Sequence, residues 1–136
     1  MGEPCEIDSS EPRSGTGDMM ESQEVPVLVG IGVVEQRVQD PAAALEPLAL
    51  MIEAVTRAAQ DAGAPDLAAR ADSVRVPRGF WDYSDPGRLV AEAVGARRAR
   101  TTLAEIGVLQ QTLVNEACVD IAAGREGLAI VVGGEA

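Results

Sequence analysis

The sequence contains no histidine and no lysine, because all eleven of its basic residues are arginine. Histidine is the side chain whose ordinary pKa lies nearest to neutrality, so its absence excludes a self-contained serine–histidine or cysteine–histidine mechanism. Cysteine is also scarce, and Cys5 and Cys118 form neither a disulfide framework nor a metal-binding pattern. We therefore expect no metal ion and no covalently bound cofactor. Such low cysteine usage is typical of a protein of the reducing cytoplasm.

Aromatic residues are almost absent, since Phe80, Trp81 and Tyr83 are the only three and lie within four positions of one another. Alanine, valine, leucine and isoleucine must therefore supply nearly all of the buried area. No segment approaches the roughly 18 consecutive apolar residues of a membrane span. The sequence also has no basic stripe, and its net charge of −11 argues against a nucleic-acid partner.

The acidic charge is concentrated in residues 1–24, which hold seven carboxylates and one arginine. This segment shows no apolar periodicity, so it is predicted to be a disordered acidic leader. Met19 and Met20 stand shortly before the first apolar run, so translation could start at Met1, Met19 or Met20. Residues 25–136 are predicted to form a single domain.

Residues 25–136 alternate between short apolar runs and segments of helical periodicity. We expect strands at 27–34, 73–76, 101–103 and 128–132, the first and last of them buried on both faces. We expect helices at 46–62, 85–94 and 108–123, each followed by a glycine that ends it. The third helix is apolar over nearly half of its circumference, which is typical of a helix sandwiched inside a larger protein.

This order predicts an α/β fold with a parallel sheet of about four strands and right-handed helical crossovers. Ligands of such sheets bind at the carboxyl ends of the strands, where we expect Gly107, Gly133, Gly134 and Glu135. Gly30 and Gly32 also form part of a dinucleotide-binding pattern, but Glu35 occupies the position of its third glycine. These two glycines are better explained by the close approach of another backbone or helix.

Several segments, in the right order, resemble the first half of a thiolase N-terminal domain. The resemblance is strongest to the divergent acetyl-CoA acetyltransferase-like and sterol-carrier-protein thiolase-like branch. It implies the incomplete first half of a thiolase-like layered fold and an ancestry in acyl-CoA acyltransferases of lipid metabolism. The segments that carry it are Val27-Leu28-Val29-Gly30-Ile31-Gly32, Trp81-x-Tyr83-x-Asp85-Pro86, Leu89-Val90-Ala91-Glu92, Leu113-Val114-Asn115-Glu116-Ala117, Ile121-Ala122-Ala123-Gly124 and Gly133-Gly134-Glu135.

The sequence departs from this family at the position of the nucleophile. The spacing places Gly107 where thiolases have the cysteine that attacks the acyl thioester, and glycine cannot supply a thiolate. Cys118 lies eleven residues further on, about 16 Å along a helix, and is interpreted as core packing. Gln111 and Asn115 could present amides toward a substrate, or could be polar residues on the less buried flank of the helix. Glu135 is interpreted as a structural carboxylate.

Three hypotheses follow. In the first, the chain is a piece of a thiolase-like acyl-CoA acyltransferase, inactive alone, with chemistry supplied by the remaining thiolase half or an oligomeric partner. In the second, it is a non-catalytic subunit that binds CoA thioesters or contributes only surface. In the third, it is a truncated product without a stable fold. The run of Arg97, Arg98 and Arg100 is either a solvated helix exit or an anion site for a ligand such as CoA.

Overall fold

The structure is a computed structural model that describes residues 24–136. The acidic leader predicted for residues 1–24 and the alternative starts at Met19 and Met20 lie outside the described residues, apart from Glu24. No helix in the described part of the chain is both long and apolar enough to cross a membrane.

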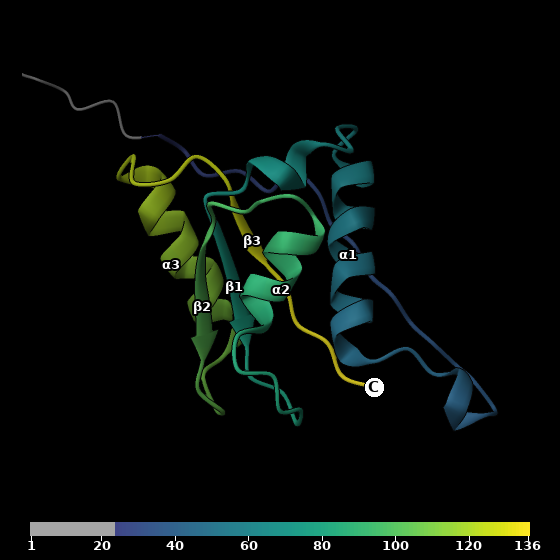
Figure 1. Cartoon of the computed structure of the whole chain (residues 1–136). Coiled ribbons are helices and arrows are strands. Elements are labelled where there is room, and N and C mark those ends of the chain that lie inside the picture. Colours follow the sequence, from purple (N-terminus) through teal and green to yellow (C-terminus); the bar gives the residue numbers. More distant parts are fainter. Residues whose placement is uncertain (1–23) are drawn as a thin grey trace, which may run out of the picture.

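Three parallel strands form the sheet (Figure 1). They are β1 (Ser73–Pro77), β2 (Arg100–Ala104) and β3 (Ala129–Val131), and β1 lies at the centre in the order β2-β1-β3. The register places Val74 opposite Thr101 on one side and opposite Ile130 on the other. The predicted α/β fold with a parallel sheet and helical crossovers is confirmed, with three strands where about four were expected.

The fourth expected strand, over residues 27–34, is not part of the sheet. This segment is extended but pairs with no strand, and the side chains of Leu28 and Val33 are 79% and 73% exposed. The prediction of a strand buried on both faces is therefore wrong. The segment runs beside the first long helix, where a Cβ atom at Gly30 or Gly32 would overlap the helix backbone. The interpretation of these glycines as points of close backbone approach is confirmed.

One face of the sheet is covered by α1 (Pro47–Asp61) and α2 (Pro86–Ala93), which contact each other. Proline opens both helices, and the Asp85 side chain caps α2 by accepting a hydrogen bond from the Arg88 amide. The short helices η1 (Pro41–Ala43) and η2 (Leu67–Arg70) flank α1 in the chain. The main core lies in this layer and consists of Met51, Val55, Ala59, Ala68, Ala71, Val74, Val76, Val90, Ala91, Ala96, Ala99 and Val132.

The opposite face of the sheet carries α3 (Gln110–Ala122), which packs on β1 and β3. Leu113 and Ala117 are its buried residues, whereas Val114 is 40% exposed and Leu109, which precedes the helix, is 68% exposed. The broad apolar stripe of α3 is thus only partly covered by the described residues. The layer order is α1 and α2, sheet, α3 (Figure 1).

Candidate functional site

The carboxyl ends of the three strands lie at one edge of the sheet, as in any parallel sheet. β1 leads into the 78–85 loop, β2 into the 105–109 loop, and β3 into the last residues of the chain (Figure 1). Pro77 and Ala104 are partners in the register, and the Arg78 amide donates to the Ala104 carbonyl oxygen at 3.1 Å. The predicted strand-end residues therefore do lie at this edge.

Gly107 lies in the 105–109 loop, between β2 and the first turn of α3. Its φ is +96°, a backbone conformation that residues with a Cβ adopt only at a cost. No atom lies within 4 Å of the place where a Cβ would stand, so the space is open. Glycine at this position therefore suits the turn, and it supplies no thiol to the edge.

Cys118 is not a substitute for that missing thiol. It is half-buried on α3 and lines an apolar groove together with Val114 and Ile121. Its position on the helix is about two turns beyond Gln110, the first residue of α3. The thiol therefore lies away from the loop that contains Gly107.

The side-chain amides of Gln111 and Asn115, which the sequence suggested as substrate contacts, form a hydrogen bond with each other. Gln111 Nε2 donates to Asn115 Oδ1 at 2.9 Å, and both side chains are exposed on the solvent side of α3. In this geometry one donor of Gln111 and the acceptor of Asn115 are already used.

Glu135 ties the end of the chain to the aromatic loop. Its Oε1 atom accepts a hydrogen bond from the Phe80 amide at 2.9 Å, and Trp81 Nε1 donates to the Gly134 carbonyl oxygen at 3.0 Å. A Cβ at Gly79 would overlap the Glu135 carboxylate, so a side chain there would displace this contact. The contact was not predictable from the sequence, because residues more than 50 positions apart carry no local signal of pairing.

The aromatic loop is held on its other side by Tyr83. The rings of Trp81 and Tyr83 lie 5.4 Å apart, and the Tyr83 hydroxyl lies 3.3 Å from Glu46 Oε2, just before α1. Phe80, by contrast, is 93% exposed. Ile106 and Leu109 on the neighbouring loop are also exposed, so apolar side chains of two loops face solvent at the carboxyl edge.

The charges of this edge are mostly negative. Its three loops contain one arginine, Arg78, and four carboxylates, which are Asp82, Asp85, Glu105 and Glu135. The arginine run at 97–100 lies at the opposite edge, because Arg100 is the first residue of β2. Arg100 also binds Glu126 at 3.2 Å. The arginines that the sequence suggested as an anion site therefore lie at the amino ends of the strands, away from Gly107.

A buried ion-pair network joins β1 to α3 and the turn that follows it. Arg75 Nη2 lies 2.6 Å from Asp120 Oδ2 and 2.7 Å from Glu126 Oε1. Burial opposes the charge of Arg75, but the hydrogen bond to Asp120 and the field of Glu126 outweigh it and raise the pKa of the guanidinium. Hydrogen bonds from Arg75 and Arg125 lower the pKa of Asp120. The network is a structural element of the α3 layer.

No cluster of three or more potential metal ligands occurs in the part of the chain that the structure describes. An acyl-transfer site would need a thiolate or an equivalent nucleophile at the carboxyl edge. The loops at this edge contain no cysteine, and the apolar side chains of Phe80, Ile106 and Leu109 are exposed there.

Among known proteins, similarity to this chain is found with solved structures. No protein-family model matches the chain, and neither does any curated protein. Among solved structures, the chain is similar to a monomeric SCP2-thiolase-like protein type 1 from Mycobacterium smegmatis. The two share 32% sequence identity over 79% of this chain, with a TM-score of 0.67.

The matched region spans 23% of the length of that mycobacterial protein. The described residues thus have a thiolase-like α/β fold, similar to one part of an SCP2-thiolase-like protein. This agrees with the family that the sequence segments resemble.

Proposed function

We propose that this chain is a thiolase-like module of an acyl-CoA-handling assembly and does not itself catalyse acyl transfer. The observation that carries the proposal is Gly107, which stands at the nucleophile position of the family resemblance with a φ of +96°. The absence of histidine removes the ordinary general base as well. The chemistry of such an assembly would come from another polypeptide or from further parts of a thiolase-like protein.

A direct test is the incubation of the purified full chain with acetoacetyl-CoA and CoA. We expect no thiolysis above the uncatalysed rate and no acetylated protein in the intact mass spectrum. Cys118→Ser is the matched control, because it removes the thiol of α3 and leaves the carboxyl edge unchanged. Turnover by the wild-type chain that disappears in Cys118→Ser would contradict the proposal.

A CoA thioester is the ligand that the family resemblance implies. Of the arginines, Arg78 stands in the carboxyl-edge loops, so we assign it the contact with a CoA phosphate if that ligand binds there. The surrounding carboxylates weaken such binding by repulsion. We expect calorimetry with CoA to give a dissociation constant in the millimolar range, about −4 kcal/mol.

The CoA phosphate could bind at Arg78 or at the arginine run at 97–100, and a pair of variants distinguishes these two positions. Arg78→Ala should weaken CoA binding several-fold, whereas Arg97→Ala at the opposite edge should leave it unchanged. Equal CoA affinity for wild type and Arg78→Ala would exclude Arg78 as the phosphate contact, and no measurable binding of CoA to wild type would favour a subunit that contributes only surface. A larger loss in Arg97→Ala would place the anion site at the arginine run.

A further inference from the structure

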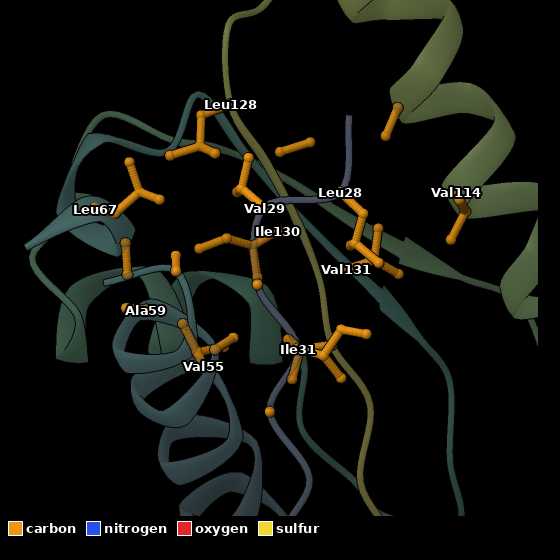
Figure 2. A pocket seen from close by; sticks show the side chains of 18 of the residues that line it. Leu28, Val29, Ile31, Val55, Ala59, Leu67, Val114, Leu128, Ile130 and Val131 are labelled. Carbon is orange, nitrogen blue, oxygen red and sulfur yellow. The ribbon is translucent and has the colours of Figure 1, made fainter. Parts of the chain in front are cut away.

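An apolar groove runs along the free edge of β3. Its volume is about 410 Å³, and every side chain that lines it is apolar, if the thiol of Cys118 is counted as such. Figure 2 shows Ile130 and Val131 of β3 beside Leu28, Val29 and Ile31 of the extended N-terminal segment. The groove thus separates the edge of the sheet from the segment that the sequence predicted to be a strand.

Both helical layers overhang this groove. Val55 and Ala59 contribute from α1 on one face of the sheet, and Val114 and Ile121 contribute from α3 on the other. A ligand lying in the plane of the sheet would therefore contact apolar side chains above and below. This two-sided environment is typical of a buried strand in a parallel sheet.

The edge of β3 that borders the groove has free backbone groups. Leu128 O accepts from the Asp72 amide just before β1, and Val132 N donates to the Arg75 carbonyl oxygen of β1. Backbone groups of successive residues alternate in direction along a strand. The N–H and C=O groups of Ala129 and Val131 consequently point away from β1. β3 is the last strand of the sheet among the described residues, so no strand of this region pairs with them.

The other wall is similarly poor in backbone pairing. Over residues 26–34 of the described chain, the backbone takes part in two hydrogen bonds, both with side chains of α1. The Ile31 amide donates to Asp61 Oδ2 at 2.9 Å, and Arg57 Nη1 donates to the Val33 carbonyl oxygen at 2.9 Å. A groove with apolar side chains and open backbone groups on its walls matches a peptide better than a hydrocarbon chain, which offers no hydrogen bond.

The lack of charged groups in the groove limits which peptides can bind there. No carboxylate or guanidinium lines the groove, so a charged side chain placed in it would lose its hydration without gaining a partner. Residues 1–24, with seven carboxylates and one arginine, are therefore a poor occupant. An uncharged strand with apolar side chains on both faces is complementary.

We propose that the groove beside β3 is a docking site for an uncharged, apolar β-strand of another polypeptide, which pairs with the outer edge of β3 and extends the sheet. Binding of this kind takes its affinity from main-chain hydrogen bonds and its selectivity from the pockets for alternate side chains. The inference does not depend on the absence of acyl transfer, since Arg78, Gly107 and Glu135 do not line the groove.

The probe is a synthetic peptide of six alternating valine and isoleucine residues between pairs of lysines, added to the full chain. Backbone amide hydrogen exchange at Ala129 and Val131 is the readout, because only main-chain pairing at the edge protects these amides. At a peptide concentration of about ten times Kd, we expect exchange at both amides to slow about tenfold. A peptide with a central proline should protect them less, since it lacks a donor.

Two variants test the role of the backbone donor. Ala129→Pro removes an N–H that faces the edge, at the first residue of an edge strand, where proline is tolerated. It should weaken peptide binding about fivefold without lowering the thermal unfolding midpoint by more than a few degrees. Ala129→Val keeps the donor and should bind the peptide within twofold of wild type.

Three results would overturn the proposal. If decanoate displaces the peptide, and the peptide never protects the amides of Ala129 and Val131, the groove binds acyl chains and not a strand. Protection of Ala129 and Val131 that rises with protein concentration in the absence of peptide would identify a second copy of the chain as the occupant. Unchanged exchange at saturating peptide would show that the edge does not bind a strand.

Discussion

Arg75 of β1 and Glu126, which follows α3, form an ion pair in which Arg75 Nη2 lies 2.7 Å from Glu126 Oε1. The Glu126 side chain is completely buried, and that of Arg75 is 6% exposed. Asp120 and Ser73 supply further contacts to the same guanidinium. This pair fixes α3 against the sheet, because a buried charge must keep its partner.

Removal of one partner should be costly. Glu126→Ala leaves Arg75 with Asp120 at 2.6 Å and the more distant Glu116 at 3.7 Å, and it removes the fully buried partner, so we expect the free energy of unfolding to fall by about 3 kcal/mol. Arg125→Ala is the matched control, since Arg125 also binds the α3 carboxylate of Asp120 but is half-exposed, and it should cost less than about 1 kcal/mol. Urea denaturation measures both. Equal losses in the two variants would contradict a special role for the buried pair.

Stability should depend on pH through Asp120. Hydrogen bonds from Arg75 and Arg125 lower its pKa in the folded protein relative to the unfolded chain. The stabilisation is therefore fully present above the unfolded value of about 3.9 and is lost as the pH falls through the lower folded value. The thermal unfolding midpoints of wild type and Asp120→Asn should move closer together as the pH falls from 6 to 2. A difference between them that stays constant over this range would argue against this linkage.

The glycines of the N-terminal segment should be sensitive to any side chain. Gly32→Ala places a Cβ against the Ala54 carbonyl of α1 and must move one of the two backbones, at a cost of about 2 kcal/mol. Gly127→Ala meets only an ordinary contact, 3.6 Å from Asp72 Oδ2, and should change stability by less than about 0.5 kcal/mol. Urea denaturation of the two variants measures their free energies of unfolding and tests this difference. If Gly32→Ala is as stable as Gly127→Ala, the segment does not pack closely on α1.

Gly107→Cys should not create a thiolase. The substitution forces a residue with a Cβ into a φ of +96° and costs about 1 to 2 kcal/mol of stability, and no histidine is present to act as base. Gly107→Ala is the control, since it has the same backbone cost without a thiol. Intact mass spectrometry after incubation with acetoacetyl-CoA should show no adduct at position 107. A stable acetyl adduct there would show that the rest of the acyl-transfer site is present.

The contact between Glu135 and Phe80 can be followed through the single tryptophan. Glu135→Ala removes the acceptor for the Phe80 amide and should loosen the aromatic loop, so that Trp81 becomes more hydrated and its emission shifts to longer wavelength. Asp82→Ala changes an exposed carboxylate of the same loop and should leave the emission unchanged. Matching spectra for Glu135→Ala and wild type would mean that Trp81 and Gly134 hold the loop without this carboxylate.

Features that depend on neighbours in the chain were predictable from the sequence. Pro47 and Asp85 mark the starts of α1 and α2, and Gly63, Gly95 and Gly124 follow their helices with positive φ. Caps and stops act within one helical turn, so the residues that specify them lie close together in the sequence. The order of elements then restricted the topology to parallel strands with helical crossovers.

The candidate site was less predictable. The sequence placed Gly107 and Glu135 at the carboxyl edge correctly, because direction in a parallel sheet follows from the connections. The pairing of Glu135 with the Phe80 amide, and the mutual hydrogen bond of Gln111 and Asn115, depend on side-chain positions in three dimensions. Neither leaves a spacing pattern that could identify it.

The sequence by itself determined most of the element types, their order, the resemblance to thiolases and the presence of glycine at position 107, since each depends on residue identity and short-range spacing. Only the tertiary structure decided which apolar runs pair. Residues 27–34 and β3 are similarly apolar, yet β3 bonds to β1, whereas the first segment lies against α1 with its backbone unpaired by any strand. Strand pairing joins residues far apart in the sequence, so hydrophobicity alone cannot determine it.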